Sequence, residues 1–495
     1  MNNIDFENLV SVNFNPQAVY PSKEYCFSPR VSYPEYPFGA DISKQKNDVY
    51  EMIRESFHML GMDDSRYGTP QWSPLSEIIQ PGETVLLKPN MVLHENQIKE
   101  NGLDCLITHP SLVRAMVDYV LIALKGTGKV IVADAPMQSC EFDLMKQNSG
   151  YNEMLRFYSN HQIDIEFIDL RNLVTKYENG VLVKQAVNTL NESVIVDLGN
   201  NSYHSDVSRD RAKKYRITNY DPTIMAEHHN AVKNEYLIAK KILSANVIIN
   251  MPKPKTHRKA GVTIALKNLV GINTNKEWLP HHTKGSKNSG KGDEYLISSK
   301  FRSLHAFVLD VYNYFHARNE NSLATRISQR ILNYFWRKAH HYNYDSFSEG
   351  SWYGNDTIWR TILDLNQILR YVDSEGVLHE KQQRKVFNVA DMIISGEAEG
   401  PLLPKPKKVG IIAMAPNNVC MDEVIAALMG IDINYIPTIK NARCNNEYPL
   451  CDTDKQPEIV SNNEQWNSHY ADIKGKPNLN FEMSSGWKDY KNPQG

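Results

Sequence analysis

Basic side chains crowd one short stretch of the sequence, residues 251–272, which reads MPKPKTHRKAGVTIALKNLVGI. Lysine ammonium groups bind phosphate and carboxylate as point charges, and histidine exchanges protons near neutral pH. Pro252 and Pro254 stiffen the loop, and a loop that only covers a sheet would not need this stiffness. The stretch therefore predicts a binding site for an anion, with a solvated loop that binds nothing as the alternative.

Five side chains are the candidates for holding the anion. Lys255 and Lys267 supply positive charge, and Asn268 supplies directional hydrogen bonds. The earlier segment LLKPN adds Lys88 and Asn90 at the end of an apolar run. These residues come from two distant stretches, so the fold must bring them together.

Two histidines and one aspartate are the candidates for catalysis by proton transfer. His257 lies in the basic stretch, and His109 precedes Pro110 in the segment THPSLVRAM. Both side chains titrate near neutral pH, as a general acid or base requires. His109 has a second interpretation, as a capping residue of the helix that Pro110 opens. We expect Asp134 to orient a histidine or to hold a cation.

The segments around these residues predict one edge of a parallel sheet. The runs NVIIN at 246–250, TVLLK at 84–88 and KVIVA at 129–133 are short and apolar, as buried strands are. A helix lies between the second and third runs, so these three elements predict a right-handed parallel unit. The runs IDIEFI from 163 and VIVDL from 194 are expected to extend the sheet. We therefore predict an α/β fold with a mostly parallel sheet, flanking helices and a cleft at the carboxyl ends of the strands.

A glycine- and lysine-rich loop at 279–292, LPHHTKGSKNSGKG, is typical of a mobile lid. We expect His281 and His282 on this loop to contact the substrate. Two apolar helical patterns follow and predict an inserted helical hairpin. The second pattern carries arginines beside aromatic residues, which suits an anionic membrane surface. Packing against the other helix is the interpretation that we favour, because apolar helical stripes mostly face a core.

Two carboxylates near the Gly400-Pro401 turn, Asp391 and Glu399, are the candidates for binding a metal. Carboxylate oxygens suit a hard divalent cation such as magnesium. Carboxylates around a bound phosphate repel it unless a cation or lysines stand between them. The cofactor is left open, with a divalent cation as one option. The six cysteines form no CxxC pair, so no iron–sulfur cluster is expected.

The composition of the chain limits the classes of protein to which it can belong. The 495 residues carry 55 basic and 57 acidic side chains, a formal net charge of −2, so nucleic acid is not an expected partner. No stretch approaches the roughly 18 uninterrupted apolar residues of a membrane helix, and the first residues lack a signal pattern, so we expect a cytoplasmic protein. The oligomeric state does not follow from the sequence.

The chain is long enough for two subdomains or for one large domain with inserted segments. We predict an irregular N-terminal arm at 1–40 and an α/β core at 41–275. A lid loop and helical insertion are expected at 276–350. The C-terminal part of the core follows at 351–445, and a polar tail at 446–495.

An ordered series of motifs now resembles one family, DUF362. The motifs are LLKPN, THPSLVRAM, VADAP, KPKTHRKAGVTIALKNLVG, GEAEGP and MDEVIAALMG, and the resemblance covers roughly residues 80 to 440. Many members carry a ferredoxin-like module with four-cysteine runs, which this chain lacks, so electron transfer is not implied. The segments NDTIWRTILDLN, WLPHH and GEAEGP resemble a subgroup associated with surface-polysaccharide gene clusters. A fainter similarity, to the nickel-pincer lactate racemase superfamily, rests on His257 and Lys267.

Three functions are consistent with these residues. The first is an enzyme that acts on an anionic small molecule, phosphorylated or carboxylated and plausibly a sugar derivative, by acid/base chemistry with cationic clamping. The second is a non-catalytic binding or scaffold protein for an anionic glycan precursor or a partner enzyme. The third is a metal- or cofactor-dependent racemase or epimerase. We expect an enzyme, with its reaction class open.

Overall fold

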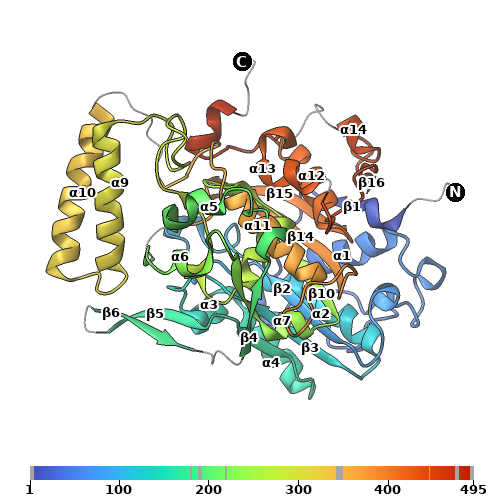
Figure 1. The fold of residues 1–495 in the computed structure, drawn as a ribbon. Coiled ribbons are helices and arrows are strands. Elements are labelled where there is room, and N and C mark those ends of the chain that lie inside the picture. The colour runs from blue at the N-terminus through green and yellow to red at the C-terminus, as the bar shows by residue number, and fades with distance from the viewer. Residues whose placement is uncertain are drawn as a thin grey trace.

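The structure is a computed structural model of the chain, shown in Figure 1. It describes residues 5–178, 181–187, 192–217, 220–341, 349–444, 446–473 and 479–490.

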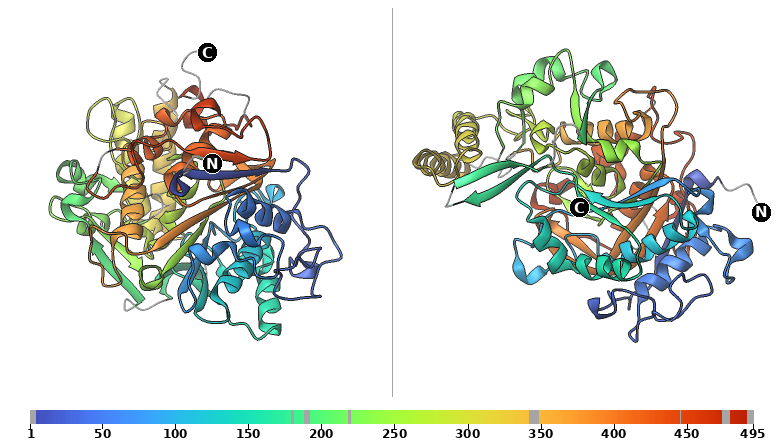
Figure 2. Two further views of the ribbon diagram at one scale, coloured as in Figure 1. Left: turned by 90° about the vertical axis from the view of Figure 1, so that its right-hand side faces the viewer. Right: turned by 90° about the horizontal axis from the view of Figure 1, so that it is seen from below.

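A ten-stranded sheet runs through the described part of the molecule (Figures 1 and 2). Its main path is, in spatial order, β16 (Glu458–Ser461), β1 (Leu9–Phe14), β15 (Leu403–Ala415), β14 (Lys385–Glu399), β10 (Val247–Met251), β2 (Thr84–Pro89), β3 (Lys129–Asp134) and β4 (Glu166–Asp169). The strands from β14 to β4 are parallel to their neighbours, whereas β15 is antiparallel to both β14 and β1. The predicted α/β class with a mostly parallel sheet is confirmed.

Helices cover both faces of this sheet because its strands are apolar on both sides. Val85 and Leu87 of β2 face one apolar core, and Leu86 faces another. The first face packs against α1 (Asp48–Met59), α2 (Pro110–Leu124), α3 (Phe142–Ser149) and α4 (Tyr151–Asn160). The second face packs against α7 (Lys240–Ser244), α8 (Ala265–Asn268), α11 (Ile358–Tyr371), α12 (Asn418–Leu428) and α13 (Pro437–Ala442). Parallel strands with helices on both faces leave their carboxyl ends as the open edge.

Shorter elements lie around this edge. The hairpin of β11 (Lys255–His257) and β12 (Gly261–Thr263) joins the sheet through Lys255, which pairs with Gly396 of β14. Three two-stranded sheets stand apart: β5 (Leu173–Glu178) with β6 (Val181–Ala186), β7 (Ser193–Asp197) with β9 (Glu235–Ala239), and β8 (Tyr215–Arg216) with β13 (His282–Thr283). The remaining short helices are α5 (Ser208–Arg211), α6 (Met225–His228) and α14 (Tyr470–Ile473).

The structure differs from the sequence prediction at three strands. The run VIVDL forms β7, which pairs with β9 and does not extend the central sheet. A short apolar run does not reveal its partner, and only Val196 of β7 is fully buried. The predicted irregular arm supplies β1, and the predicted polar tail supplies β16, which pairs with β1 in parallel. Both ends of the chain therefore contribute to the sheet.

The predicted helical hairpin is present as α9 (Lys300–His316) and α10 (Leu323–His341), which project from the body (Figure 1). Its packing follows the favoured interpretation only in part. Leu332, Phe335 and Trp336 are half-buried, whereas Leu323 and Ile327 on the same helix are exposed by 74% and 47%. Across the described ranges, no helix combines the length and the apolar character that crossing a membrane requires.

Candidate functional site

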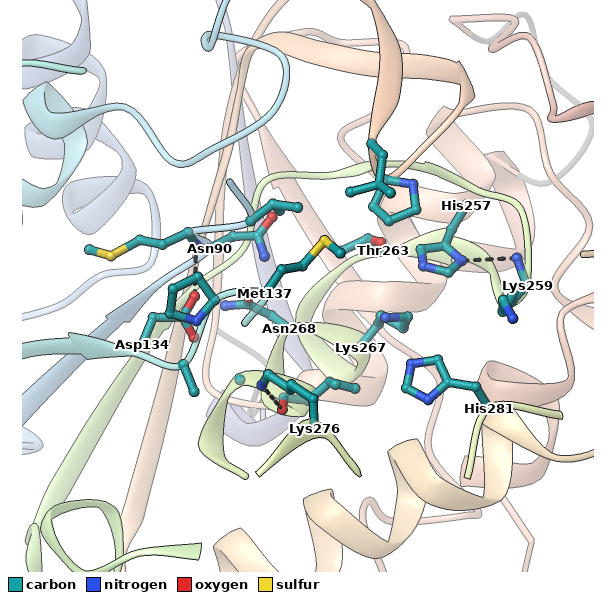
Figure 3. Close-up of a pocket in the computed structure, with 18 of the residues that line it drawn as sticks. Asn90, Asp134, Met137, His257, Lys259, Thr263, Lys267, Asn268, Lys276 and His281 are labelled. Atoms are coloured by element: carbon teal, nitrogen blue, oxygen red, sulfur yellow. Dashed lines mark hydrogen bonds between the residues drawn. The ribbon is translucent and has the colours of Figure 1, made fainter. Parts of the chain in front are cut away.

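A cavity of about 220 Å³ opens at the carboxyl ends of the parallel strands, shown in Figure 3. Its walls come from the ends of β2 and β3, from the β11–β12 hairpin, from α8 and from the segment that follows α8. The structure brings seven of the predicted residues to this cavity, namely Asn90, Asp134, Lys255, His257, Lys267, Asn268 and His281. The predicted convergence of distant segments at this edge therefore holds for these residues.

A buried ion pair connects the two strands beneath the cavity. Lys88 Nζ lies 2.7 Å from Asp134 Oδ1, and both side chains are almost completely buried. The other oxygen, Asp134 Oδ2, accepts a hydrogen bond of 2.7 Å from the Met91 backbone N–H. Burial lowers the pKa of Lys88, and the nearby Asp134 carboxylate opposes this shift. Lys88 therefore lies below the cavity wall, where it compensates Asp134 and does not reach a ligand.

The backbone of Gly271 lies directly against this ion pair. A Cβ atom at this position would collide with Asp134 Oδ1 and would lie 2.7 Å from Lys88 Nζ. The Gly271 carbonyl also accepts a hydrogen bond of 2.9 Å from the Ala135 backbone N–H. A glycine is thus required here for close approach of the backbone to the pair.

Four lysine side chains line the cavity, and burial lowers the pKa of each. The pKa of Lys259 and that of Lys267 fall to about 8, and that of Lys276 falls to about 7. The pKa of Lys255 falls well below its usual value because of burial and the nearby Lys253. Each ammonium group gives up hydration on burial, and this cost outweighs the attraction of nearby carboxylates such as Glu349 for Lys259 and Asp134 for Lys276, so the charged form is disfavoured. A bound anion would reverse this effect.

Three of these lysines have protein hydrogen-bond acceptors. Lys255 Nζ donates to Asn90 Oδ1 and to the Leu106 carbonyl, both at 2.6 Å. Lys259 Nζ donates to the Glu349 carbonyl at 2.5 Å. Lys276 Nζ donates to the Val270 and Asn273 carbonyls at 3.3 and 3.1 Å.

Lys267 differs from the other three. Within the described ranges its ammonium group makes no hydrogen bond or ion pair. Asp422 of α12 fixes the helix that carries it, since Asp422 Oδ1 accepts hydrogen bonds from the backbone N–H groups of Ala265 and Leu266 at 2.7 and 3.2 Å. Lys267 is therefore a positioned cation that is free to meet a ligand.

Two further polar atoms of the cavity residues lack partners in the described structure. Thr263 Oγ1 and Asn268 Oδ1 are buried and make no hydrogen bond. Buried polar atoms are rarely left unpaired without a functional reason. The rest of the wall is apolar and includes Met91, Val92, Met137, Ile217, Val270 and Leu402. The cavity thus combines cations, two unused polar atoms and an apolar wall, as small-molecule sites do.

The two cavity histidines are held in opposite tautomers by their backbone contacts. His257 Nδ1 accepts hydrogen bonds from the backbone N–H groups of Lys259 and Ala260 at 3.0 and 3.1 Å, so we assign the proton to Nε2. His281 Nδ1 lies 2.8 Å from the Leu279 carbonyl, which can only accept, so we assign the proton to Nδ1. Burial lowers the pKa of both rings well below the usual value, and nearby lysines add to this shift. His257 therefore offers an N–H donor and His281 offers a lone pair.

The other two predicted histidines also lie outside the cavity wall. His109 is the capping residue of α2 and stacks on Tyr20 with ring centroids 4.0 Å apart. Its pKa falls well below the usual value because of burial and the nearby Lys253. His282 is buried, with Nδ1 3.4 Å from Lys259 Nζ. The structure thus favours the capping interpretation of His109.

The predicted metal ligands do not meet. Asp391 and Glu399 lie on the same strand, β14, eight residues apart, which corresponds to roughly 26 Å. Asp391 is buried against Lys253, with Oδ2 2.7 Å from Nζ, and accepts a hydrogen bond of 2.5 Å from Tyr20. Glu399 accepts one from the Ser485 backbone N–H at 2.7 Å. Among the described residues, no group of three or more His, Cys, Asp or Glu side chains is arranged to hold a metal ion.

The cavity residues that escaped the sequence-based selection include four with polar or charged side chains close to the predicted ones. Arg258 and Lys259 lie in the basic stretch, and their density there was the available signal. Lys276 and Thr263 carried no such signal, because their approach to the cavity depends on the turns after α8 and in the β11–β12 hairpin.

The sequence resembles proteins of one family whose function is unknown. DUF362, described as a domain of unknown function, matches residues 85–196 and 200–427. A thylakoid-associated protein of Synechocystis sp. is 23% identical over 225 residues, which are 46% of this chain and 50% of that protein. The match therefore spans about half the length of this relative.

One protein of known crystal structure, from Thermotoga maritima, aligns with 73% of this chain and 54% of its own chain at 10% identity. The TM-score of this alignment is 0.27, which does not establish a shared fold.

The lowered lysine pKa values predict that the protein becomes more stable as pH rises from about 7 to about 10. Below pH 7 these lysines are protonated in both states, so the full cost of burying their charge is present. Above it the folded state releases protons at pKa values of about 7 to 8, whereas the unfolded state holds them up to its value of 10.5. Stability rises wherever the unfolded state binds more protons. Urea midpoints across this range should therefore increase, and Lys267→Met should flatten the increase. Equal pH slopes for both proteins would contradict the assignment.

Replacing Gly271 with alanine should disturb the ion pair beneath the cavity. The added Cβ meets Asp134 Oδ1, so the side chains must shift, and we expect a loss of about 1–3 kcal/mol in the free energy of unfolding. Chemical denaturation of the purified variant measures this loss. An unchanged midpoint would show that the backbone does not press on the pair.

The opposite tautomers can be measured by NMR with ¹⁵N-labelled histidine. We expect the His257 signal to show a protonated Nε2 and the His281 signal a protonated Nδ1, because each Nδ1 is committed to the backbone. Neither ring should gain a second proton near pH 6.5, since burial lowers both pKa values. The variants His257→Gln and His281→Gln assign the signals, and identical tautomers would refute the assignment.

Proposed function

The chain belongs to the DUF362 family, and we propose that it binds an anionic small molecule in the cavity and transforms it by acid/base chemistry. One observation carries this proposal. Lys255, Lys259, Lys267 and Lys276 meet at a cavity whose wall contains one carboxylate, Asp134, and Lys88 already compensates that carboxylate. The charge of Lys267, which makes no hydrogen bond or ion pair within the described ranges, is unfavourable in a dry site, so the site gains free energy when an anion enters.

The proposed ligand is a phosphorylated or carboxylated molecule with a polar body. Lys267 is the first contact for the anionic group, because it makes no hydrogen bond or ion pair within the described ranges. Thr263 Oγ1 and Asn268 Oδ1 would accept hydrogen bonds from hydroxyl groups, as in a sugar derivative. The apolar wall beside Met137 would cover a carbon face.

His257 and His281 have different roles in the proposed proton transfer. His281 presents the Nε2 lone pair and acts as the base, whereas His257 presents an N–H and donates to a developing negative charge. This assignment revises the expectation that His257 exchanges protons, since its Nδ1 is occupied by two backbone donors. A bound anion would neutralise the lysine charges that lower the His281 pKa and would make it a stronger base.

The biological context stays a prediction. A role in surface-polysaccharide synthesis rests on the resemblance of three segments to one subgroup. The thylakoid association in the name of the Synechocystis protein belongs to that protein.

Replacing Lys267 with methionine tests the proposed anion site. The change removes one charge but leaves no protein acceptor unpaired, so the fold should be retained. We expect binding of inorganic phosphate, pyrophosphate or a sugar phosphate to weaken about ten- to hundredfold, the contribution of a charged hydrogen bond. Isothermal titration calorimetry measures the affinity. Repetition in buffers of different ionisation enthalpy should reveal proton uptake above pH 8, because bound anions restore the lysine charges.

Lys255→Met is the matched variant. It removes the same charge but leaves Asn90 Oδ1 and the Leu106 carbonyl without their donor, so it should lower thermal stability as well as binding. Undiminished affinity for every anion in the Lys267 variant would refute the proposed site.

A further inference from the structure

The outer face of α10 carries an unpartnered apolar stripe. Leu323, Ile327 and Ile331 follow each other at four-residue intervals, and Tyr334 comes three residues later, which places all four on one side of the helix. Their exposed fractions are 74%, 47%, 43% and 55%. Residues on the opposite side, such as Thr325, Ser328 and Ala339, are buried. One side of α10 is therefore buried against the protein, whereas the opposite, apolar side is exposed to solvent.

Basic side chains border this stripe. Arg326, Arg330 and Arg337 recur at spacings of four and seven residues and form an adjacent row on the helix surface. In the described residues none of these three arginine side chains makes an ion pair or hydrogen bond, and all three residues are exposed. Lys338 lies over the Tyr334 ring, 5.8 Å from its centroid. The sequence of α10 contains no acidic residue, so no carboxylate of this helix compensates the arginine row.

The hairpin stands clear of the body, and α9 lies between α10 and the rest of the molecule (Figures 1 and 2). On α9 the residues Leu304, Phe307 and Tyr314 are also exposed, by 44%, 60% and 38%. An extended flat surface could therefore contact α10 without contacting the ten-stranded sheet or its flanking helices.

We propose that α10 docks the protein onto an anionic lipid surface. The apolar stripe would enter the region between headgroups and acyl chains, and the arginine row would lie among the lipid phosphates. A second copy of this chain fits the face less well, because a helix without acidic residues would set its cations against those of an identical helix. This proposal is independent of the function proposed for the cavity.

Co-sedimentation with lipid vesicles tests the docking. The full chain should bind vesicles of phosphatidylglycerol mixed with phosphatidylcholine, should bind phosphatidylcholine vesicles poorly, and should dissociate as salt rises. The triple variant Arg326→Gln, Arg330→Gln, Arg337→Gln should weaken binding about a hundredfold, as loss of three cations near an anionic surface implies. The variant Leu323→Ser, Ile327→Ser, Ile331→Ser should weaken it more than about tenfold.

The matched control replaces three exposed arginines on the body, Arg30, Arg156 and Arg209, with glutamine. It changes the net charge equally and should bind vesicles as the wild type does. Thermal melting and phosphate affinity should be unchanged in all variants, which separates this test from the cavity. Failure of the wild type to bind anionic vesicles, equal loss in the control, or a concentration-dependent dimer that only the α10 variants abolish would overturn the proposal.

Discussion

Burial of the Lys88–Asp134 ion pair is the constraint around which the cavity is organised. The two charges lie at the carboxyl ends of neighbouring strands, 2.7 Å apart and out of contact with water. Such a pair is costly to desolvate and very costly to break, because each partner would leave the other as an isolated buried charge. It therefore fixes the strand ends, and the Gly271 backbone that rests on them fixes the path of the chain after α8.

The same pair explains the charge of the cavity. Asp134 is the one carboxylate in the described wall of the cavity. Its negative charge is compensated by Lys88, which is buried and does not line the cavity. The four lysines that line the cavity lie close together and are buried, and their pKa values fall. A similar network, in which Lys253, Asp391 and Tyr20 hold each other with contacts of 2.5–2.7 Å, lies beside α2 and satisfies its own charges internally.

Sequence patterns located the sheet edge and much of the cavity, but not the partners of individual side chains. The apolar runs at β2, β3 and β10 and the right-handed crossover place Asn90, Asp134 and Lys255 together. The sequence also predicted Asp391 as a metal ligand near the Gly400-Pro401 turn, although its carboxylate accepts a hydrogen bond from Tyr20, 371 residues earlier. A contact of that sequence separation leaves no local signal, and neither does the backbone geometry that sets a histidine tautomer.

The position of β1 bears on how the chain is made. This strand is synthesised before β2, β3 and β10, yet its neighbours in the sheet, β15 and β16, are synthesised after all three of them. Until then both of its edges are unpaired, a state that invites pairing with other chains. The parallel strands β2, β3 and β10 can assemble earlier around their own helices. The edges of β1 therefore need protection from wrong pairing until β15 and β16 have been synthesised.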